Sequence, residues 1–379
     1  MTALTSVGLL RPSIRLLGRS VSSFLAIGAL GFVVGIGLPA VIAPSVGRST
    51  GVIAGLGGVA ILVFLGLAMW TKVRTGDESL TFYHHAVAVI VAVVAALVVG
   101  GQPILPYLDL AMIGFAAFLV LGRIGCLTVG CCHGRPAGWG IRYSQEHRVE
   151  GLPWYLVDVA LVPVQALEAG WVLVVVLGGG LAMLGAADPG IVLAWTVSSY
   201  AVGRFCLEFL RGDAERRWRH GFTEAQWTSL VLAAAVAVAV VVGWLPFAAW
   251  QLAGPVSIAV AMVVVTVRRR SSRLHLLLRA DHVHQVAEMV EAAHRSALAR
   301  PDAPPAIGFT GLGVRVSAGH VETDLGLAHL YSISSEWDVL RHREAAEIGD
   351  LIVRLRHRGA SARLLEGYNG VHHVLVLEA

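Results

Sequence analysis

Charged residues are scarce in this sequence. Asp, Glu, Lys and Arg make up 14% of its 379 residues, against about 25% in an ordinary soluble domain, and Lys72 is the single lysine. Hydrophobic residues reach 56%. A soluble core of this chain length would not bury so much apolar surface, whereas a bilayer accepts it on every side of a helix. The composition therefore excludes an ordinary soluble protein and predicts a membrane protein.

Cysteine is also rare, and motifs for nucleic-acid binding are lacking. The four cysteines are Cys126, Cys131, Cys132 and Cys206. None of them lies in the charged C-terminal part, so we expect no disulfide framework. The formal net charge of +4 comes from arginines spread between apolar runs. That pattern is typical of topology signals and of contact with anionic lipid headgroups, so we predict no nucleic-acid partner.

Apolar runs of at least about 17 residues predict eight membrane-spanning helices. They lie near residues 21–43, 51–70, 84–100, 107–127, 155–184, 190–210, 225–244 and 248–267. Basic residues gather before the first span and after the second, fourth, sixth and eighth spans, which places both termini in the cytoplasm by the positive-inside rule. We predict an all-α polytopic membrane protein of about seven or eight helices, with a small soluble α+β domain at its C-terminus.

The chain changes character after residue 270. From Arg268 onward it carries 14 arginines, 13 acidic residues and ten of the fifteen histidines, which we expect to be mostly solvated. Helical spacing over 273–299 predicts an amphipathic helix, and three prolines over 301–305 a linker. Strand patterns near 314–316, 329–333, 362–365 and 371–377 accompany a helical pattern over 338–358. We therefore divide the chain into a transmembrane domain (1–270), an amphipathic helix with its linker (271–305) and a soluble domain (306–379).

Ionisable residues at bilayer depth form two clusters. Such groups are costly there and persist mainly where they line a cavity or pair with one another. The first cluster ends the fourth span and contains Arg123 and Arg135. The second shares one face of the sixth span and contains Tyr200, Arg204, Glu208 and Arg211. Two interpretations stay open: a salt-bridged pair within the bundle, or arginines of two helices that meet in an anion site suited to a phosphate.

The turn after the fourth span offers sulfur and imidazole ligands in Cys126, Cys131, Cys132 and His133. Its spacing is poor for a tetrahedral metal ion, because the adjacent Cys131 and Cys132 are not expected to reach one ion together. Redox-active thiols are a second interpretation and small apolar packing residues a third. We predict packing residues, and neither a metal nor a cofactor.

At these residues the sequence resembles the prolipoprotein diacylglyceryl transferase family, a set of polytopic membrane enzymes. The likeness covers most of residues 80–230 and consists of several motifs in the same order. The matching positions are Gly122, Arg123, Ile124, Gly125, Gly130, Gly134, Arg135, Pro163, Gln165, Glu168, Tyr200, Arg204, Glu208, Arg211, Asp213, Gln226 and Ser229.

The resemblance implies transfer of a diacylglyceryl group from phosphatidylglycerol to the lipobox cysteine thiol of a preprolipoprotein, with release of glycerol phosphate, in the cytoplasmic membrane. It implies that Arg123 and Arg204 hold the phosphate and stabilise the charge that develops on it. His84 would act as general base on the thiol, with Glu208 as a further catalytic residue. The implied substrate-binding residues are Tyr200, Arg211, Gln165, Glu168 and Arg135.

The sequence departs from the family pattern in three places. His84 is followed by His85 and Ala86 where the family has two glycines, Cys126 replaces the signature asparagine, and Cys131 replaces an acidic residue. A non-catalytic phospholipid-binding paralogue that recruits a partner through its soluble domain is therefore the alternative to the enzyme. A transporter ranks last, because no inverted repeat or broken-helix pair is evident.

Sidedness also stays open at this point. In the family the arginines face away from the cytoplasm, whereas the positive-inside count directs the basic loops after the fourth and sixth spans inward. An outward site would put the C-terminal domain outside the cell, and an inward site would put it in the cytoplasm.

Overall fold

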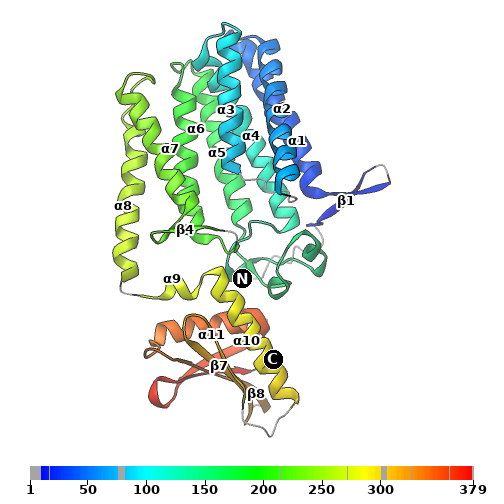
Figure 1. Ribbon diagram of the computed structural model, residues 1–379, viewed down its shortest axis with the longest axis vertical. Helices are drawn as coiled ribbons and strands as arrows, with labels where there is room; N and C mark the ends of the chain where they lie inside the picture. Colours follow the sequence, from blue (N-terminus) through cyan, green and yellow to red (C-terminus); the bar gives the residue numbers. More distant parts are fainter. Residues whose placement is uncertain are drawn as a thin grey trace.

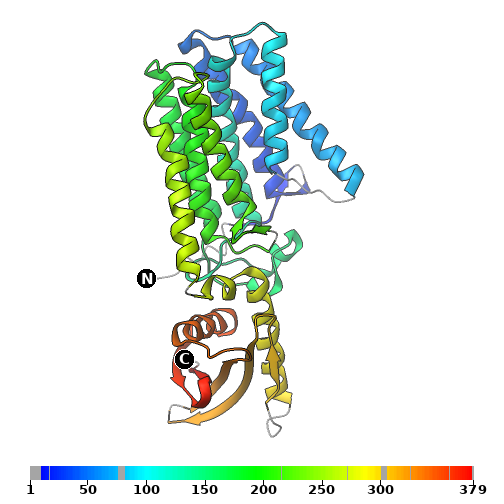
Figure 2. The ribbon, with the colours of Figure 1, turned by 60° about the vertical axis from the view of Figure 1, so that its left-hand side comes forward.

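The computed structural model describes residues 10–16, 18–75, 82–214, 216–270, 272–299, 305–324, 326–357 and 359–377. Its described part contains eight long helices that run side by side (Figures 1 and 2). They are α1 (Ser23–Ile42), α2 (Thr50–Thr75), α3 (Phe82–Val99), α4 (Ile104–Val129), α5 (Val164–Leu184), α6 (Ile191–Leu207), α7 (Glu224–Val241) and α8 (Trp250–Arg270). Short paired strands precede α1, namely β1 (Ser13–Leu16) and β2 (Arg19–Ser22).

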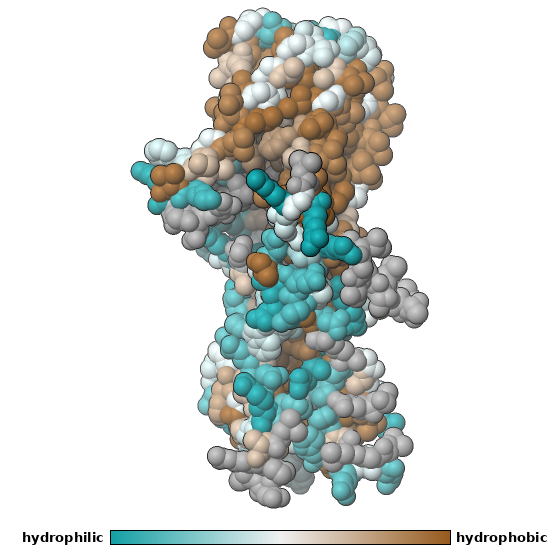
Figure 3. Space-filling model, turned by 90° about the vertical axis from the view of Figure 1, so that its right-hand side faces the viewer, coloured by the Kyte–Doolittle hydropathy of each residue, from teal (hydrophilic) through white to brown (hydrophobic). Residues whose placement is uncertain are grey.

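Six of the described helices are long and apolar enough to cross a membrane: α1, α2, α4, α5, α7 and α8. The described side chains of α3 give a shorter apolar helix, and α6 has 17 residues. The bundle carries exposed apolar side chains on its outer surface, such as Val33, Leu62, Val99 and Val241. Figure 3 shows this apolar band over the helices and a hydrophilic surface below it. The predicted polytopic fold is confirmed.

The predicted start of the fifth span, near residue 155, is wrong. Helix α5 begins at Val164, directly after Pro163, and the residue before a proline is disfavoured in helical conformation. The preceding residues instead form a short 3-10 helix at Trp154–Leu156, and Val157 and Leu161 make backbone bridges to the segment after α4. Their hydrophobicity reflects burial in a loop, which an apolar run alone does not distinguish from a span.

A carboxylate buried in the bundle fixes α6 against α4. Asp109 of α4 accepts hydrogen bonds from the backbone N–H groups of Gly190 and Leu193, each at 2.7 Å. Those N–H groups belong to the first turn of α6, which has no internal partner for them. A carboxylate at a helix N-terminus also interacts favourably with the positive end of the helix dipole. Asp109 therefore positions the helix that carries Arg204.

The loop between α4 and α5 folds across the end of the bundle. It contains β3 (Pro136–Ile141) and short 3-10 helices at Gln145–Glu150 and Trp154–Leu156. Gly134 lies against Val162 so closely that a Cβ atom at Gly134 would come within 2.2 Å of the Val162 carbonyl oxygen. A glycine is required where two backbone segments approach in this way. The two ends of the loop, which lie next to α4 and α5, are thereby held together.

The C-terminal domain is a five-stranded antiparallel sheet with helices on one face. Its elements are α9 (Leu274–Leu277), α10 (Ala280–Ala299), β6 (Ile307–Phe309), β7 (Val314–Thr323), β8 (Gly326–Ser335), α11 (His342–Arg356), β9 (Ser361–Glu366) and β10 (His372–Leu377). The strand order is β6-β7-β8-β10-β9, and β9 and β10, which match the strand patterns expected near 362–365 and 371–377, pair as an antiparallel hairpin. The predicted α+β class is confirmed, while the three domain boundaries stay predictions.

Four tail histidines correct the expectation of solvated side chains. His282, His294, His357 and His372 are all under 9% exposed. His282 and His294 lie on α10, His357 directly follows α11 and His372 lies on β10, and all four rings are buried. His282 shows how burial is tolerated: its Nδ1 lies 2.8 Å from the Leu277 carbonyl oxygen and its Nε2 lies 3.1 Å from the Thr310 hydroxyl.

The hydrophobic core of this domain continues into the α4–α5 loop. One cluster of buried residues joins Tyr143, Leu156 and Leu161 of the loop to the apolar faces of α10, α11 and the sheet. The rings of Tyr155 and His284 stack with their centroids 5.1 Å apart. The domain is thus packed against the same end of the bundle at which α4 and α6 terminate (Figure 1).

Candidate functional site

Three helices bring opposite charges together inside the bundle. Arg123 of α4 and Glu168 of α5 form an ion pair in which Nη2 lies 3.0 Å from Oε1. The second oxygen of Glu168 lies 3.9 Å from Nη1 of Arg204 on α6. All three residues are under 9% exposed. The sequence placed these groups on separate spans, and the structure shows that one carboxylate bridges the two arginines.

The network continues along the end of α6. Nη1 of Arg204 lies 2.8 Å from Oε2 of Glu208, which is the i,i+4 pair expected from the sequence. Arg216 approaches the other Glu208 oxygen at 3.9 Å, and Arg211 pairs with Asp213 at 2.7 Å. Four arginines therefore face three carboxylates in this network. One net positive charge remains, which suits an anionic ligand.

One buried guanidinium nitrogen of the network has neither a hydrogen bond nor an ion-pair contact among the described residues, whereas Nη1 of Arg204, which also lacks a hydrogen bond, contacts Glu168 and Glu208. Nε of Arg123 is buried and has no hydrogen-bond partner among the described residues. A guanidinium presents its donors as a planar fork that matches two oxygens of a phosphate or carboxylate. Leaving such a donor buried and unpaired is costly, so its presence marks a place for an acceptor that a ligand supplies.

Gln165 joins the network to the turn after α4. Its Nε2 donates to the Cys131 carbonyl oxygen at 2.8 Å and lies 3.4 Å from the Tyr143 hydroxyl. That hydroxyl in turn donates to the Leu127 carbonyl oxygen at 3.1 Å. The amide of Gln165 is buried. The residue predicted to bind substrate therefore holds the backbone of the cysteine-rich turn.

The backbone of Arg135 has a structural place, while its side chain is exposed. Its N–H donates to the Leu210 carbonyl oxygen at 3.0 Å, and its own carbonyl accepts from Val162 at 3.1 Å. These bonds tie the loop after α4 to the end of α6. The side chain thus lies at the rim of the site rather than within the buried network.

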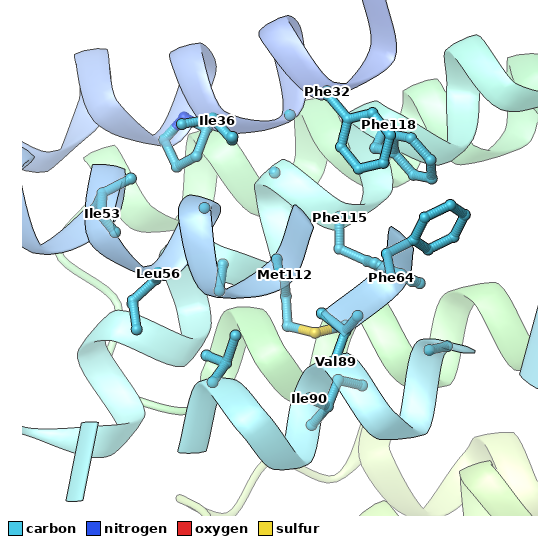
Figure 4. Close-up of a pocket in the computed structure, with 18 of the residues that line it drawn as sticks. Phe32, Ile36, Ile53, Leu56, Phe64, Val89, Ile90, Met112, Phe115 and Phe118 are labelled. Carbon is cyan, nitrogen blue, oxygen red and sulfur yellow. The ribbon is translucent and has the colours of Figure 1, made fainter. Parts of the chain in front are cut away.

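Two apolar pockets lie between the helices of the bundle. The larger holds about 130 Å³ and lies between α1, α2, α3 and α4 (Figure 4), where it is lined by Phe32, Phe64, His85, Phe115 and Phe118 among others. The smaller holds about 90 Å³ and is lined by residues from α3 to α7. Tyr200, one turn before Arg204 on α6, lines the smaller pocket. The two pockets share Ala86, Ile90, Met112 and Phe115 as a common wall.

The side chain of His84, the predicted general base, is not among the described parts of the structure. The residue itself lies in α3. Its neighbour His85 is buried, and its ring lies 5.1 Å from that of Phe64 in the larger pocket. The catalytic role of His84 stays a prediction.

The cysteines after α4 lie beside the network. Gly130 ends the helix with φ of 81°, and the chain then turns so that Cys131 and Cys132 approach Cys126. Cys132 lies in the turn that follows α4, and the pKa of its thiol is well below the ordinary value. The thiols of Cys126 and Cys131, which donate hydrogen bonds to its sulfur, are the main cause, and Arg211 adds a favourable charge. The spacing argument from the sequence did not anticipate this convergence.

Sequence reasoning missed Arg216 and Tyr143. Arg216 lies in a basic loop eight residues after Glu208 and was counted only as a topology signal. Tyr143 is 2% exposed in the core of the α4–α5 loop and supports Gln165. Both residues belong to irregular segments. The sequence around them therefore shows no helical or strand periodicity that would identify them as buried site residues.

Buried ionisable side chains that meet across helices of a polytopic bundle indicate a membrane protein with an intramembrane polar site. The sequence matches the profile of the prolipoprotein diacylglyceryl transferase family over residues 50–242. The chain belongs to this family.

Curated relatives are similar over a shorter segment. A phosphatidylglycerol–prolipoprotein diacylglyceryl transferase of Dehalococcoides mccartyi strain 195 is 28% identical over 127 residues, which are 34% of this chain and 47% of the relative. Proteins with the same description from two other strains of that species are 30% identical over 127 residues, with the same coverage. The chain spans about half the length of the curated relatives it matches.

Proposed function

We propose that this protein transfers a diacylglyceryl group from phosphatidylglycerol to the lipobox cysteine thiol of a preprolipoprotein in the cytoplasmic membrane. The observation that carries the proposal is the buried junction of Arg123, Glu168 and Arg204. The family match and the names of the curated relatives support the same reaction.

The junction has the chemistry of a phosphate site. Two guanidinium groups on different helices offer forked donors, and Nε of Arg123 still lacks an acceptor among the described residues. Glu168 lies between the two arginines and limits their mutual repulsion while no lipid is bound. A phosphate diester would take the free donor and add one negative charge to a network with one positive charge in excess.

The pockets have the chemistry of lipid tails. Both are lined almost entirely by apolar side chains and are separated by a wall that α3 and α4 share. Two adjacent apolar pockets suit the two acyl chains of a diacylglyceryl group. Because Tyr200 lines the smaller pocket and precedes Arg204 by one turn, that pocket extends toward the phosphate site. A lipid bound in this way has its headgroup at the arginines and its tails between the helices.

The reaction then needs a nucleophile and a stabilised leaving group. The acceptor sulfur attacks the carbon of the diacylated glycerol that is bonded to a phosphate oxygen. A carbon–sulfur bond forms, the carbon–oxygen bond breaks, and its electron pair leaves with glycerol phosphate. Arg123 and Arg204 stabilise the charge on that phosphate. His84 accepts the thiol proton, and Glu208 and Arg211 complete the electrostatic surroundings.

Complementation tests this proposal. The protein is expressed in bacterial cells depleted of their own transferase, and diacylglyceryl-modified lipoprotein is measured by mass spectrometry. Arg123→Ala and Arg204→Ala are expected to lower the modification rate by about 100- to 1,000-fold, the usual loss when a donor to a developing anion is removed. Arg148→Ala, at an exposed arginine of the α4–α5 loop, is the matched control and is expected to act like wild type.

Two results would contradict the proposal. One is well-inserted wild-type protein that gives no modified lipoprotein; the other is full modification by both arginine variants. In the first case, saturable binding of phosphatidylglycerol that Arg123→Ala abolishes would favour the phospholipid-binding paralogue.

A further inference from the structure

Three thiols gather at the end of α4. The Sγ atoms of Cys126, Cys131 and Cys132 all lie within 4.8 Å of one another, and all three cysteines are free. Cys126 is buried in the last turns of the helix, and the other two are half-buried in the turn that follows. Packing residues would be expected to point in different directions, whereas these three converge.

The convergence depends on an unusual backbone. Consecutive residues of an extended chain point to opposite sides, so adjacent cysteines do not ordinarily share a target. Here Gly130 is left-handed with φ of 81°, and Cys132 is left-handed with φ of 52°. A non-glycine residue pays a steric penalty in that region, and such residues cluster at functional sites. The hydrogen bond from Gln165 to the Cys131 carbonyl oxygen holds the turn in this shape.

The spacing of the sulfur atoms fits a metal ion. Zinc binds thiolate at about 2.3 Å in tetrahedral geometry, which places two ligand sulfurs about 3.8 Å apart. The observed separations, all within 4.8 Å, exceed that value by at most about 1 Å. Three sulfur ligands select zinc and other thiophilic ions over magnesium or calcium, which bind oxygen.

The surrounding charges fit the same ion. Three thiolates and one divalent cation carry a net charge of −1 together. Arg123 and Arg211 both interact electrostatically with Cys132, and the network to which they belong carries one net positive charge beside this anionic centre. A buried charge is tolerated when such a partner compensates it.

We propose that Cys126, Cys131 and Cys132 bind one thiophilic divalent ion, with zinc as its reference, and leave its fourth tetrahedral position for the thiol of the acceptor. Three protein ligands with one open position are the arrangement of catalytic zinc sites. The acceptor thiol displaces a water molecule, gives its proton to His84, the base of the proposed reaction, and binds as a thiolate beside Arg123. The binding of the ion stands by itself, whereas the role of the fourth position rests on the proposed transferase function.

Cobalt(II) reports on such a site directly. The full chain is purified in detergent under anaerobic conditions, reduced, stripped of metal with a chelator and titrated with cobalt. A Cys₃ site gives sulfur-to-cobalt charge-transfer bands in the near ultraviolet and tetrahedral d–d bands in the visible region, at one ion per chain. Zinc is expected to displace the cobalt and abolish both sets of bands.

Variants assign the bands to the three thiols. Cys126→Ser, Cys131→Ser and Cys132→Ser are each expected to lose most of the charge-transfer intensity. Cys206→Ser changes an exposed cysteine on α6 and is the matched control. It is expected to keep the full charge-transfer intensity. A reduced wild-type chain that shows no cobalt bands overturns the proposal whether or not the variants fold.

A small acceptor tests the fourth position. N-acetylcysteinamide is expected to increase the charge-transfer intensity by about one third, because a fourth thiolate joins three, whereas N-acetylserinamide leaves the spectrum unchanged. An unchanged spectrum with both compounds overturns the open position. Because these readouts do not depend on turnover, a chain that binds cobalt and fails complementation would refute the transferase function and leave the metal site standing.

Discussion

Replacing Glu168 by glutamine is the sharpest test of the ionic junction. The change keeps the shape of the side chain and removes the one negative charge that lies 3.0 Å from Arg123 and 3.9 Å from Arg204. Two guanidinium groups, each under 9% exposed, then face one another without their bridge. Removing one partner of a buried ion pair costs about 3–5 kcal/mol, because the remaining charge stays buried without compensation.

Thermal unfolding of the detergent-solubilised chain measures that loss. For a protein of this size, 1 kcal/mol corresponds to about 2–4 °C in Tm, so Glu168→Gln is expected to lower Tm by roughly 6–20 °C. Phosphatidylglycerol added to the micelles should recover part of the loss, because its phosphate replaces the missing charge. Glu146→Gln, at an exposed carboxylate of the α4–α5 loop, is the matched control and should move Tm by less than about 2 °C. Equal unfolding temperatures for Glu168→Gln and wild type would refute the buried junction.

Three further predictions address the elements around the site. Gly134→Ala should destabilise the chain by about 1–3 kcal/mol, since its Cβ would lie 2.2 Å from the Val162 carbonyl oxygen; an unchanged Tm would show that the loop can move aside. Asp109→Ala should cost about 2–4 kcal/mol by removing two charge-assisted bonds to the start of α6, again measured by thermal unfolding. Burial lowers the pKa of His282 below its ordinary 6.5, so the unfolded state binds protons more readily and stability falls as pH drops from about 6.5. Circular dichroism should show a smaller acid loss in His282→Asn, and an equal loss would count against this assignment.

Much of the bundle could be predicted from the sequence because a membrane imposes a simple rule. Long apolar runs become helices unless they pair with a loop, and seven of the eight predicted spans start within a few residues of the first residue of a helix. The exception follows from Pro163, where the apolar run continues but the helix begins only afterwards. Local periodicity describes the helices well, and it does not describe a buried loop.

The candidate site was predictable only in part. The face shared by Arg204 and Glu208 follows from helical spacing, and the structure confirms their contact. That Glu168 bridges two arginines depends on how α4, α5 and α6 pack, which no single segment encodes. The convergence of the cysteines depends on the left-handed backbone of Cys132, and a non-glycine residue gives no sequence signal for that conformation.

The shared core of the C-terminal domain and the α4–α5 loop has a consequence for access. The domain lies beneath the end of the bundle where the arginines gather (Figure 2). Its packing against Tyr143 and Tyr155 occupies the direction along the helix axes, so a large molecule does not reach the arginines head-on. Large molecules therefore reach the junction from the side, between the helices. This is the plane in which lipids and membrane-inserted peptides diffuse. For large partners, this packing therefore favours molecules that share the bilayer with the protein.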